Sequence, residues 1–272
     1  MINKNIILFI VLVGVAFGSS LDDISPGING FAKGNCGLTR AWEWDYALAN
    51  PALLARDTIR GTISIENSRW LMDTSIYKLA VSYQLFGINM NAGIIRLNDD
   101  TGFEYTSATG TFNSMVQYSE NLSYLGMGFR TLGIDSGITF KYFFKKALLE
   151  KNYYALDYAL LLGDKKSLEL ALKLNNFMGS FEKNDNFFYY SAGVNWSINS
   201  LVLFMEYMDN YKKLRYGAGF ELDNLTLSAG IDEDSGFSAG LGINLGSFVL
   251  DYAYKNINVL GVVNRFGISL IF

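Results

Sequence analysis

The most constraining feature of the sequence is an alternation of apolar and polar residues that recurs, segment by segment, from residue 58 to residue 272. In the segment 168–175 every second residue is leucine, and Glu169 and Lys173 stand between the leucines. Successive side chains of a strand point to opposite faces. Segments of about ten alternating residues separated by turns are therefore typical of a membrane-spanning β-barrel, with one face toward lipid and one toward a lumen. A soluble β-sandwich also alternates, but rarely with so bulky an apolar face in nearly every strand. The pattern favours an all-β, transmembrane antiparallel barrel.

We predict about fourteen strands, an even number of the kind that bacterial barrels have. The segment 109–119 alternates weakly, and because a further strand would make the number odd, we assign it to a long loop and leave open whether it pairs. Short and longer connections alternate along the chain, as periplasmic turns and outer loops do. The predicted strands are 59–67, 76–85, 88–96, 121–131, 134–144, 152–162, 166–176, 187–196, 200–208, 214–222, 225–231, 236–243, 247–255 and 262–272.

The first 18 residues have the pattern of a secretory signal peptide. Lys4 precedes an apolar run over 6–13 that is too short to span a bilayer, and small residues follow at Ala16 and Gly18. A buried strand or a membrane anchor is the alternative. We expect cleavage near Ser19 and export to the bacterial outer membrane.

Residues 19–57 do not alternate, and we predict that they form a plug inside the barrel. Glycines and both prolines of the chain interrupt this segment, which would suit a disordered tail. Trp42, Trp44 and the leucines near them are too apolar for disorder. The barrel then occupies residues 58–272.

The composition excludes several kinds of chemistry. Histidine is absent, which removes Ser-His-Asp hydrolysis and nearly every histidine-based metal site. Cys36 is the only cysteine, so no intramolecular disulfide can form. The net charge of −4, with no basic stripe, argues against a nucleic-acid partner. We expect no enzymatic activity, no metal site and no cofactor.

Charged residues on the polar face of the strands are expected to line the lumen. Both signs occur in near balance, whereas an ion-selective pore would carry a ring of one sign. We therefore expect cross-strand ion pairs and contacts to the plug. The predicted lumen-facing charges are Arg60, Glu66, Lys78, Asp135, Lys141, Asp157, Glu169, Lys173, Glu206, Arg215, Glu221, Asp251 and Arg265.

Aromatic residues gather near the strand ends on the long-loop side and predict a girdle at the level of the lipid headgroups. They include the adjacent pairs at 143–144, 153–154, 187–188 and 189–190. The final Phe272 ends an alternating strand and resembles an outer-membrane assembly signal.

Several short motifs resemble those of FadL-type outer-membrane barrels, which include the long-chain fatty-acid transporters and the PorV/PorQ family of type IX secretion. The run from Asp45 to Ala55, with Asn50-Pro51-Ala52 at its centre, resembles their plug motif, although Leu53 stands where the family usually has glycine. The segments 137–142, 251–254 and 264–266 resemble the PorV/PorQ family more closely. The resemblance implies a barrel of about fourteen strands.

We expect the chain to pass hydrophobic small molecules, such as long-chain fatty acids, across the outer membrane. Asn50, Pro51 and Ala52, together with Trp42 and Trp44, are the expected plug and gate. The alternatives are a PorV/PorQ-like accessory barrel for secretion or surface attachment, and a purely structural barrel. The expected partners are membrane lipids and lipopolysaccharide, an apolar ligand, and, under the first alternative, secretion-system proteins. The lysine pairs at 145–146 and 212–213 could contact lipid phosphates, or could simply be solvated.

Overall fold

The computed structural model describes residues 27–56, 61–69, 74–99, 103–106, 113–116, 118–146, 150–180, 188–210, 212–232, 236–257 and 261–272. The predicted signal peptide, residues 19–26 of the predicted plug, and Arg60 lie outside the described residues.

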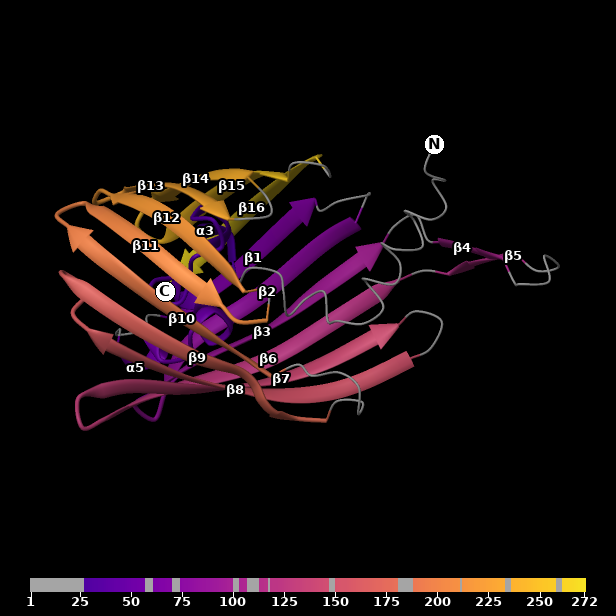
Figure 1. Ribbon diagram of the computed structural model, residues 1–272, viewed down its shortest axis with the longest axis horizontal. Coiled ribbons are helices and arrows are strands. Elements are labelled where there is room, and N and C mark those ends of the chain that lie inside the picture. Colours follow the sequence, from indigo (N-terminus) through magenta and orange to yellow (C-terminus); the bar gives the residue numbers. More distant parts are fainter. Residues whose placement is uncertain are drawn as a thin grey trace.

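The chain forms a closed antiparallel barrel of fourteen strands (Figure 1). Strands that are consecutive in sequence pair with one another, except that β3 pairs with β6, and β1 closes the barrel on β16. Each predicted strand corresponds to one barrel strand, so the predicted fold is confirmed. The barrel strands are β1 (Thr62–Arg69), β2 (Thr74–Leu85), β3 (Ile88–Asp99), β6 (Ser119–Thr131), β7 (Ile134–Lys146), β8 (Glu150–Gly163), β9 (Leu168–Gly179), β10 (Tyr189–Ile198), β11 (Leu201–Met208), β12 (Lys213–Glu221), β13 (Leu225–Asp232), β14 (Gly236–Asn244), β15 (Phe248–Ile257) and β16 (Gly261–Ile271).

A separate hairpin lies between β3 and β6. Its strands β4 (Phe103–Thr106) and β5 (Asn113–Val116) pair only with each other and project beyond the barrel rim at the right of Figure 1. The segment 109–119 therefore contributes β5 and the first residue of β6 but adds no strand to the barrel. This resolves the question that its weak alternation left open.

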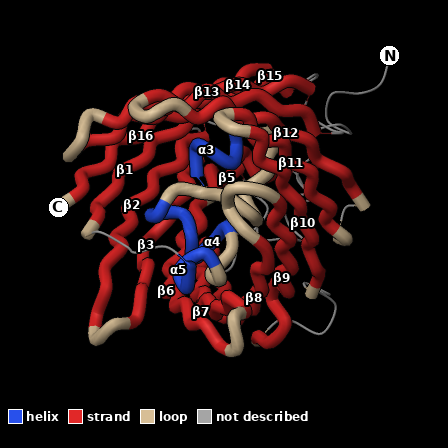
Figure 2. The backbone as a smooth tube through the Cα atoms, turned by 90° about the vertical axis from the view of Figure 1, so that its left-hand side faces the viewer, coloured by secondary structure: helices blue, strands red, loops and turns tan. Residues whose placement is uncertain are grey.

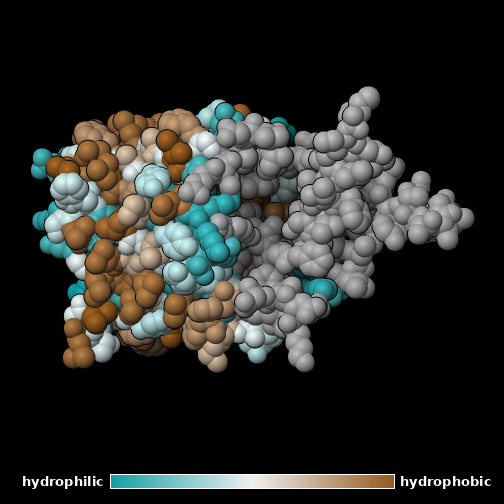
Figure 3. All heavy atoms as spheres, in the orientation of Figure 1, coloured by the Kyte–Doolittle hydropathy of each residue, from teal (hydrophilic) through white to brown (hydrophobic). Residues whose placement is uncertain are grey.

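The outer surface of the barrel is apolar, as the alternation predicts. In β9, Leu170 is 49% exposed while its neighbour Glu169 is 1% exposed, and Phe220 and Phe248 also point outward. Apolar side chains cover much of the described face in Figure 3, with hydrophilic ones at its left-hand end. So extensive an exposed apolar surface suits contact with lipid rather than water.

The two ends of the barrel differ less in loop length than the sequence predicts. At the long-loop end, β7 continues to Lys146 and β8 begins at Glu150, so only three residues connect them where seven were expected. The residue pairs that lengthen these two strands beyond the prediction are polar, Lys145 with Lys151 and Lys146 with Glu150. Strand ends of this kind extend beyond the apolar band and need no apolar face, so an alternation of apolar and polar residues does not indicate them.

The predicted aromatic girdle is partly wrong. Tyr154 and Tyr190 point outward, but Phe143 and Tyr189 are buried. Phe143 stacks on the ring of Tyr153, with the ring centroids 4.6 Å apart. Adjacent residues of a strand point to opposite faces, so one member of each aromatic pair must face the lumen.

Inside the barrel, residues 27–56 form a plug toward the short-turn end (Figure 2). The plug consists of short helical turns, α3 (Gly27–Ala32), η1 (Glu43–Asp45), α4 (Tyr46–Ala49) and α5 (Leu53–Arg56), joined by irregular chain. Among the described residues, no helix is long and apolar enough to cross a membrane.

Candidate functional site

The centre of the plug is the turn at Asn50-Pro51-Ala52, which is buried against the wall. Asn50 is extended, with φ −160° and ψ 106°, as expected of a residue before proline. Its side-chain amide donates to the carbonyl of Leu38 at 2.7 Å, and its Oδ1 accepts from the N–H of Ala52 at 2.9 Å. Asn50 therefore joins two parts of the plug to each other, because the carbonyl of Leu38 lies beside its amide.

Glycines in the wall allow the plug backbone to approach the strands closely. A Cβ on Gly137 of β7 would lie 2.2 Å from the carbonyl carbon of Pro51, and one on Gly128 of β6 would lie 2.3 Å from the amide nitrogen of Ala55. The sequence suggested that glycines relieve strand bending. Here they are needed for the close approach of a second backbone.

Polar side chains of the strands hold the backbone of the plug. Asn91 on β3 accepts from the N–H of Ala47 at 3.1 Å, and Thr139 on β7 donates to the carbonyl of the same residue. Ser82 on β2 donates to the carbonyl of Glu43 at 2.8 Å. Since short helical turns leave most of their backbone groups unpaired, these wall residues satisfy groups whose burial would otherwise be costly.

Two plug arginines bind acidic residues at the short-turn end of the barrel. Arg56 forms ion pairs with Asp135, at 2.8 Å, and with Glu169. Arg40 lies 3.3 Å from the same Glu169 and 2.8 Å from Glu221. We call Arg40, Arg56, Asp135, Glu169 and Glu221 the arginine latch. It joins the plug to β7, β9 and β12.

Further charges fix the other parts of the plug. Asp45 pairs with Lys78 of β2. The ring of Phe31 lies 4.1 Å from the guanidinium carbon of Arg265 and 5.1 Å from the ammonium of Lys255. Lys33 is buried beside Phe204, and this burial lowers its pKa to about 8 against the opposing effects of Glu221 and Glu206.

The predicted lumen charges fall into separate groups inside the barrel. Lys141 and Lys173 flank Asp157, at 2.9 and 3.0 Å, and Lys173 also donates to the carbonyl of Leu48 in the plug. Glu206 accepts from the N–H of Leu38 at 2.6 Å. Glu66 pairs with Arg265, and both are buried. Asp251 is buried near Trp42, and Arg215 is half-buried near Met208.

Apolar side chains cluster on the lumen side of β2, β3, β6, β7 and β8, on the long-loop side of the plug, and share their rows with the buried charges of Lys78, Glu120 and Lys141. The register places these apolar side chains in adjacent inward-facing rows. Trp42, Trp44 and Leu48 of the plug pack against this surface, and the two tryptophan rings stack with centroids 5.3 Å apart. We call it the apolar lumen wall: Ile76, Ala80, Ile95, Leu97, Leu122, Tyr124, Phe143, Tyr153 and Ala155.

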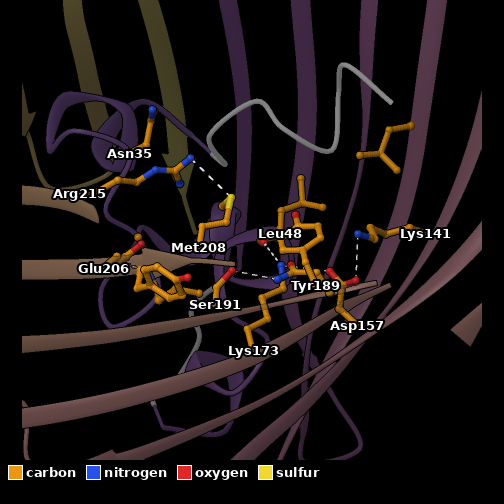
Figure 4. A pocket seen from close by; sticks show the side chains of 16 residues that line it. Asn35, Leu48, Lys141, Asp157, Lys173, Tyr189, Ser191, Glu206, Met208 and Arg215 are labelled. Carbon is orange, nitrogen blue, oxygen red and sulfur yellow. Dashed lines mark hydrogen bonds and ion pairs between the residues drawn. The ribbon is translucent and has the colours of Figure 1, made fainter. Parts of the chain in front are cut away.

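A small cavity lies between this wall and the opposite side of the barrel (Figure 4). Leu48 and Leu122 line it together with the charged residues Lys141, Asp157, Lys173, Glu206 and Arg215. Its volume is about 60 Å³. Pockets for small organic ligands usually measure about 300–1,000 Å³, so this cavity is too small for such molecules.

Within the described residues, no group of three or more acidic or cysteine side chains is placed to hold a metal ion. Cys36 is buried in the plug beside Val202 and Phe204.

Sequence reasoning missed the plug's own charges. Arg40, Asp45 and Arg56 lie in an irregular segment, where no periodicity indicates a direction for their side chains. One signal was available: charged residues in a segment that is expected to be buried need partners, and the lumen face of the strands offers charges of both signs.

No protein-family model matches the sequence, and no curated protein matches it. Among solved structures, the toluene transporter TodX of Pseudomonas putida is similar, with a TM-score of 0.66 and 10% identity over 92% of this chain and 99% of that one. A second structure of it gives a TM-score of 0.64 and 11% identity over 89% and 96%. A variant described as a monoaromatic hydrocarbon channel gives 0.63 and 11% over 92% and 100%.

At this identity the likeness shows the fold alone: this chain shares the barrel fold of TodX. The closer relationship to the PorV/PorQ family receives no support from these comparisons.

Proposed function

We propose that this protein is a plugged passage for hydrophobic small molecules in the bacterial outer membrane. The observation that carries the proposal is the apolar lumen wall, which leads from the long-loop side of the barrel to Trp42, Trp44 and Leu48 of the plug. A water-filled porin has a polar interior. Apolar side chains along the lumen instead favour solutes that leave water readily. The apolar exterior and the fold shared with TodX suggest the outer-membrane location.

Passage requires the plug to move. The cavity of about 60 Å³ is too small for a fatty acid or an aromatic hydrocarbon together with its surroundings. Apolar clusters join the plug to the wall beside the hydrogen bonds and ion pairs, so movement of the plug must separate apolar surfaces as well as exchange polar contacts for water. The closed ladder of the barrel does not include the plug and can stay intact while the plug moves.

The substrate class follows from the same surface. We propose long-chain fatty acids or similar apolar compounds, and the likeness to the toluene transporter TodX makes an aromatic hydrocarbon the natural second probe.

Uptake by a host that lacks its own transporter tests the proposal. Cells producing the protein should accumulate labelled oleate or toluene faster than cells with an empty vector, and should show no faster uptake of a sugar. Phe143→Gln should lower the gain by about an order of magnitude, since a buried aromatic surface is worth about 2 kcal/mol. Phe140→Gln is the matched control, because Phe140 lies on the same strand but is 45% exposed on the outer face.

Equal loss in both variants would show that the lumen surface is not the path. If the wild-type protein gave no uptake above background, the passage would be excluded and a docking barrel of the PorV/PorQ kind would become the better explanation.

A further inference from the structure

Near the long-loop end, the outer surface of β16, β1, β2, β3 and β6 changes from apolar to polar across three successive rows of residues. The register aligns these outward-facing side chains across the strands. One row is largely apolar, the next carries aromatic and polar residues, and the last is polar. In the order β16, β1, β2, β3, β6, the rows are Ile268, Ile65, Leu79, Ile94, Ser123; then Phe266, Asn67, Tyr77, Arg96, Asn121; then Asn264, Arg69, Ser75, Asn98, Ser119.

Two arginines therefore lie at the boundary of the apolar band. Arg96 is eight residues from Ile88, the outward-facing residue at the short-turn end of the same strand. Eight residues extend about 26 Å along a strand, or about 20 Å along the axis of a barrel whose strands tilt by about 40°. This height approaches the about 25 Å of the apolar band of such barrels. Together with the change from apolar to polar rows, it places Arg96 and Arg69 near the outer edge of the band, where lipid headgroups begin.

These arginines lack acidic partners among the described residues. The Nε of Arg96 donates to Oδ1 of Asn98 at 2.9 Å, which directs the guanidinium toward the polar row. Arg69 forms no hydrogen bond or ion pair within the described part of the chain, and both side chains are exposed. Farther along the polar row, Lys146 is paired with Glu150 at 3.8 Å, and Lys145 lies over the ring of Tyr118. Of the two lysine pairs that could contact lipid phosphates, the pair at 145–146 thus interacts with neighbouring side chains.

The opposite half of the barrel is different. In the described parts of β9 to β15, the outward-facing residues include no lysine or arginine, and aromatic residues such as Tyr190, Tyr207 and Tyr216 lie near the long-loop end. Among the described outward-facing strand residues, the arginines without an acidic partner are Arg69 on β1 and Arg96 on β3.

We propose that Arg69 and Arg96 bind the phosphorylated headgroup of a membrane lipid. The two strands that carry them are separated only by β2, and Arg69 is level with Asn98, two residues beyond Arg96. Their backbones are therefore about 12 Å apart. Two extended arginine side chains can close this gap on one phosphate, which the guanidinium fork binds in bidentate fashion. The apolar row at Ile65, Leu79 and Ile94 lies directly below and receives the acyl chains. This site is separate from the lumen and does not depend on the proposed passage.

Native mass spectrometry of the full-length protein in a nonionic detergent tests the assignment. The protein is titrated with bisphosphorylated lipid A, with its dephosphorylated form, and with inorganic phosphate. The double variant Arg69→Gln/Arg96→Gln should bind bisphosphorylated lipid A about tenfold more weakly than the wild type. The dephosphorylated lipid should bind both proteins equally weakly.

The double variant Lys165→Gln/Lys166→Gln is the matched control. It removes the same charge from the exposed turn between β8 and β9, at the opposite end of the barrel, and should bind like the wild type. Heat-modifiable migration of every variant in gels verifies that the barrel is folded. Equal lipid binding by the arginine variant and the wild type would overturn the proposal. Equal weakening in the lysine control would also overturn it, as would binding of inorganic phosphate as tight as that of the lipid.

Discussion

Arg56 is the last residue of the plug helix α5, and its Nε lies 2.8 Å from Oδ2 of Asp135 near the start of β7. The same guanidinium also pairs with Glu169 of β9. Arg40 meets the same Glu169 from another part of the plug. One buried carboxylate thus joins two distant plug residues to the wall. The arginine latch is for this reason the point at which a single substitution should affect the plug most.

Glu169→Gln should loosen the plug while leaving the barrel closed. Removing one partner of a buried ion pair usually costs about 3–5 kcal/mol. Arg40 and Arg56 keep Glu221 and Asp135, so the cost should fall at the lower end of that range. In planar bilayers the variant should show more frequent opening events than the wild type.

The matched control for this substitution is Glu150→Gln, which makes the same change in an exposed pair at the opposite end of the barrel. It should conduct like the wild type. Conductance of Glu169→Gln that cannot be distinguished from that of Glu150→Gln would show that the latch does not hold the plug.

Asn50→Ala should expose the centre of the plug to solvent exchange. The substitution leaves the carbonyl of Leu38 and the N–H of Ala52 without their partners, at about 1–3 kcal/mol each. Hydrogen exchange of amides 46–56 should accelerate, whereas the strand amides should stay protected because the closed ladder does not include Asn50. Asn29→Ala, a half-buried position in α3, should change neither. Faster exchange throughout the strands would mean that plug and barrel unfold together.

Val81→Arg should destabilise the barrel in lipid by about 2–4 kcal/mol, because Val81 points outward near the middle of the apolar band. Ser75→Arg, on the same face of the same strand but at its polar end, should cost about 0–1 kcal/mol. Urea unfolding in phospholipid vesicles measures both. Similar costs at the two positions would place the apolar band elsewhere on the barrel.

The fold was accessible from the sequence because lipid and lumen impose opposite demands on adjacent residues of every strand. Leu170 and Glu169 show this directly, since one is exposed and the other buried. Where a strand extends beyond the apolar band, as at Lys145 and Lys146, its outer face need not be apolar. The alternation of apolar and polar residues then no longer indicates a strand. The same rule, applied to adjacent aromatics such as Tyr189-Tyr190, would have placed one ring of each pair in the lumen.

From the sequence, only the extent and the burial of the plug could be predicted, and not its contacts. Its apolar content predicted burial, but its contacts depend on where irregular chain meets particular wall residues. Nothing local to Asn50 indicates that Leu38, twelve residues earlier, supplies its partner. Nor could the sequence show that Gly128 and Gly137 serve the plug, because a glycine in a strand also fits a bend or a bulge.

A disulfide that ties the plug to the wall, and that can be reduced, tests whether apolar solutes pass only when the plug moves. A Cβ on Gly193 of β10 would lie 3.2 Å from the Cβ of Leu38, close to the separation that a disulfide spans. Leu38→Cys/Gly193→Cys, in a Cys36→Ser background, therefore ties the plug to the wall. Gly37→Cys/Ala49→Cys, in the same background, is the control, because these positions lie 3.7 Å apart within the plug and tie it only to itself.

The measurement is the rate of labelled oleate or toluene uptake by transporter-deficient cells, before and after reduction. The account predicts that the oxidised Leu38–Gly193 pair of cysteines reduces uptake to the empty-vector level, that reduction restores it, and that the Gly37–Ala49 pair leaves it unchanged in both states. Uptake at the wild-type rate with the plug locked to β10 would contradict the account.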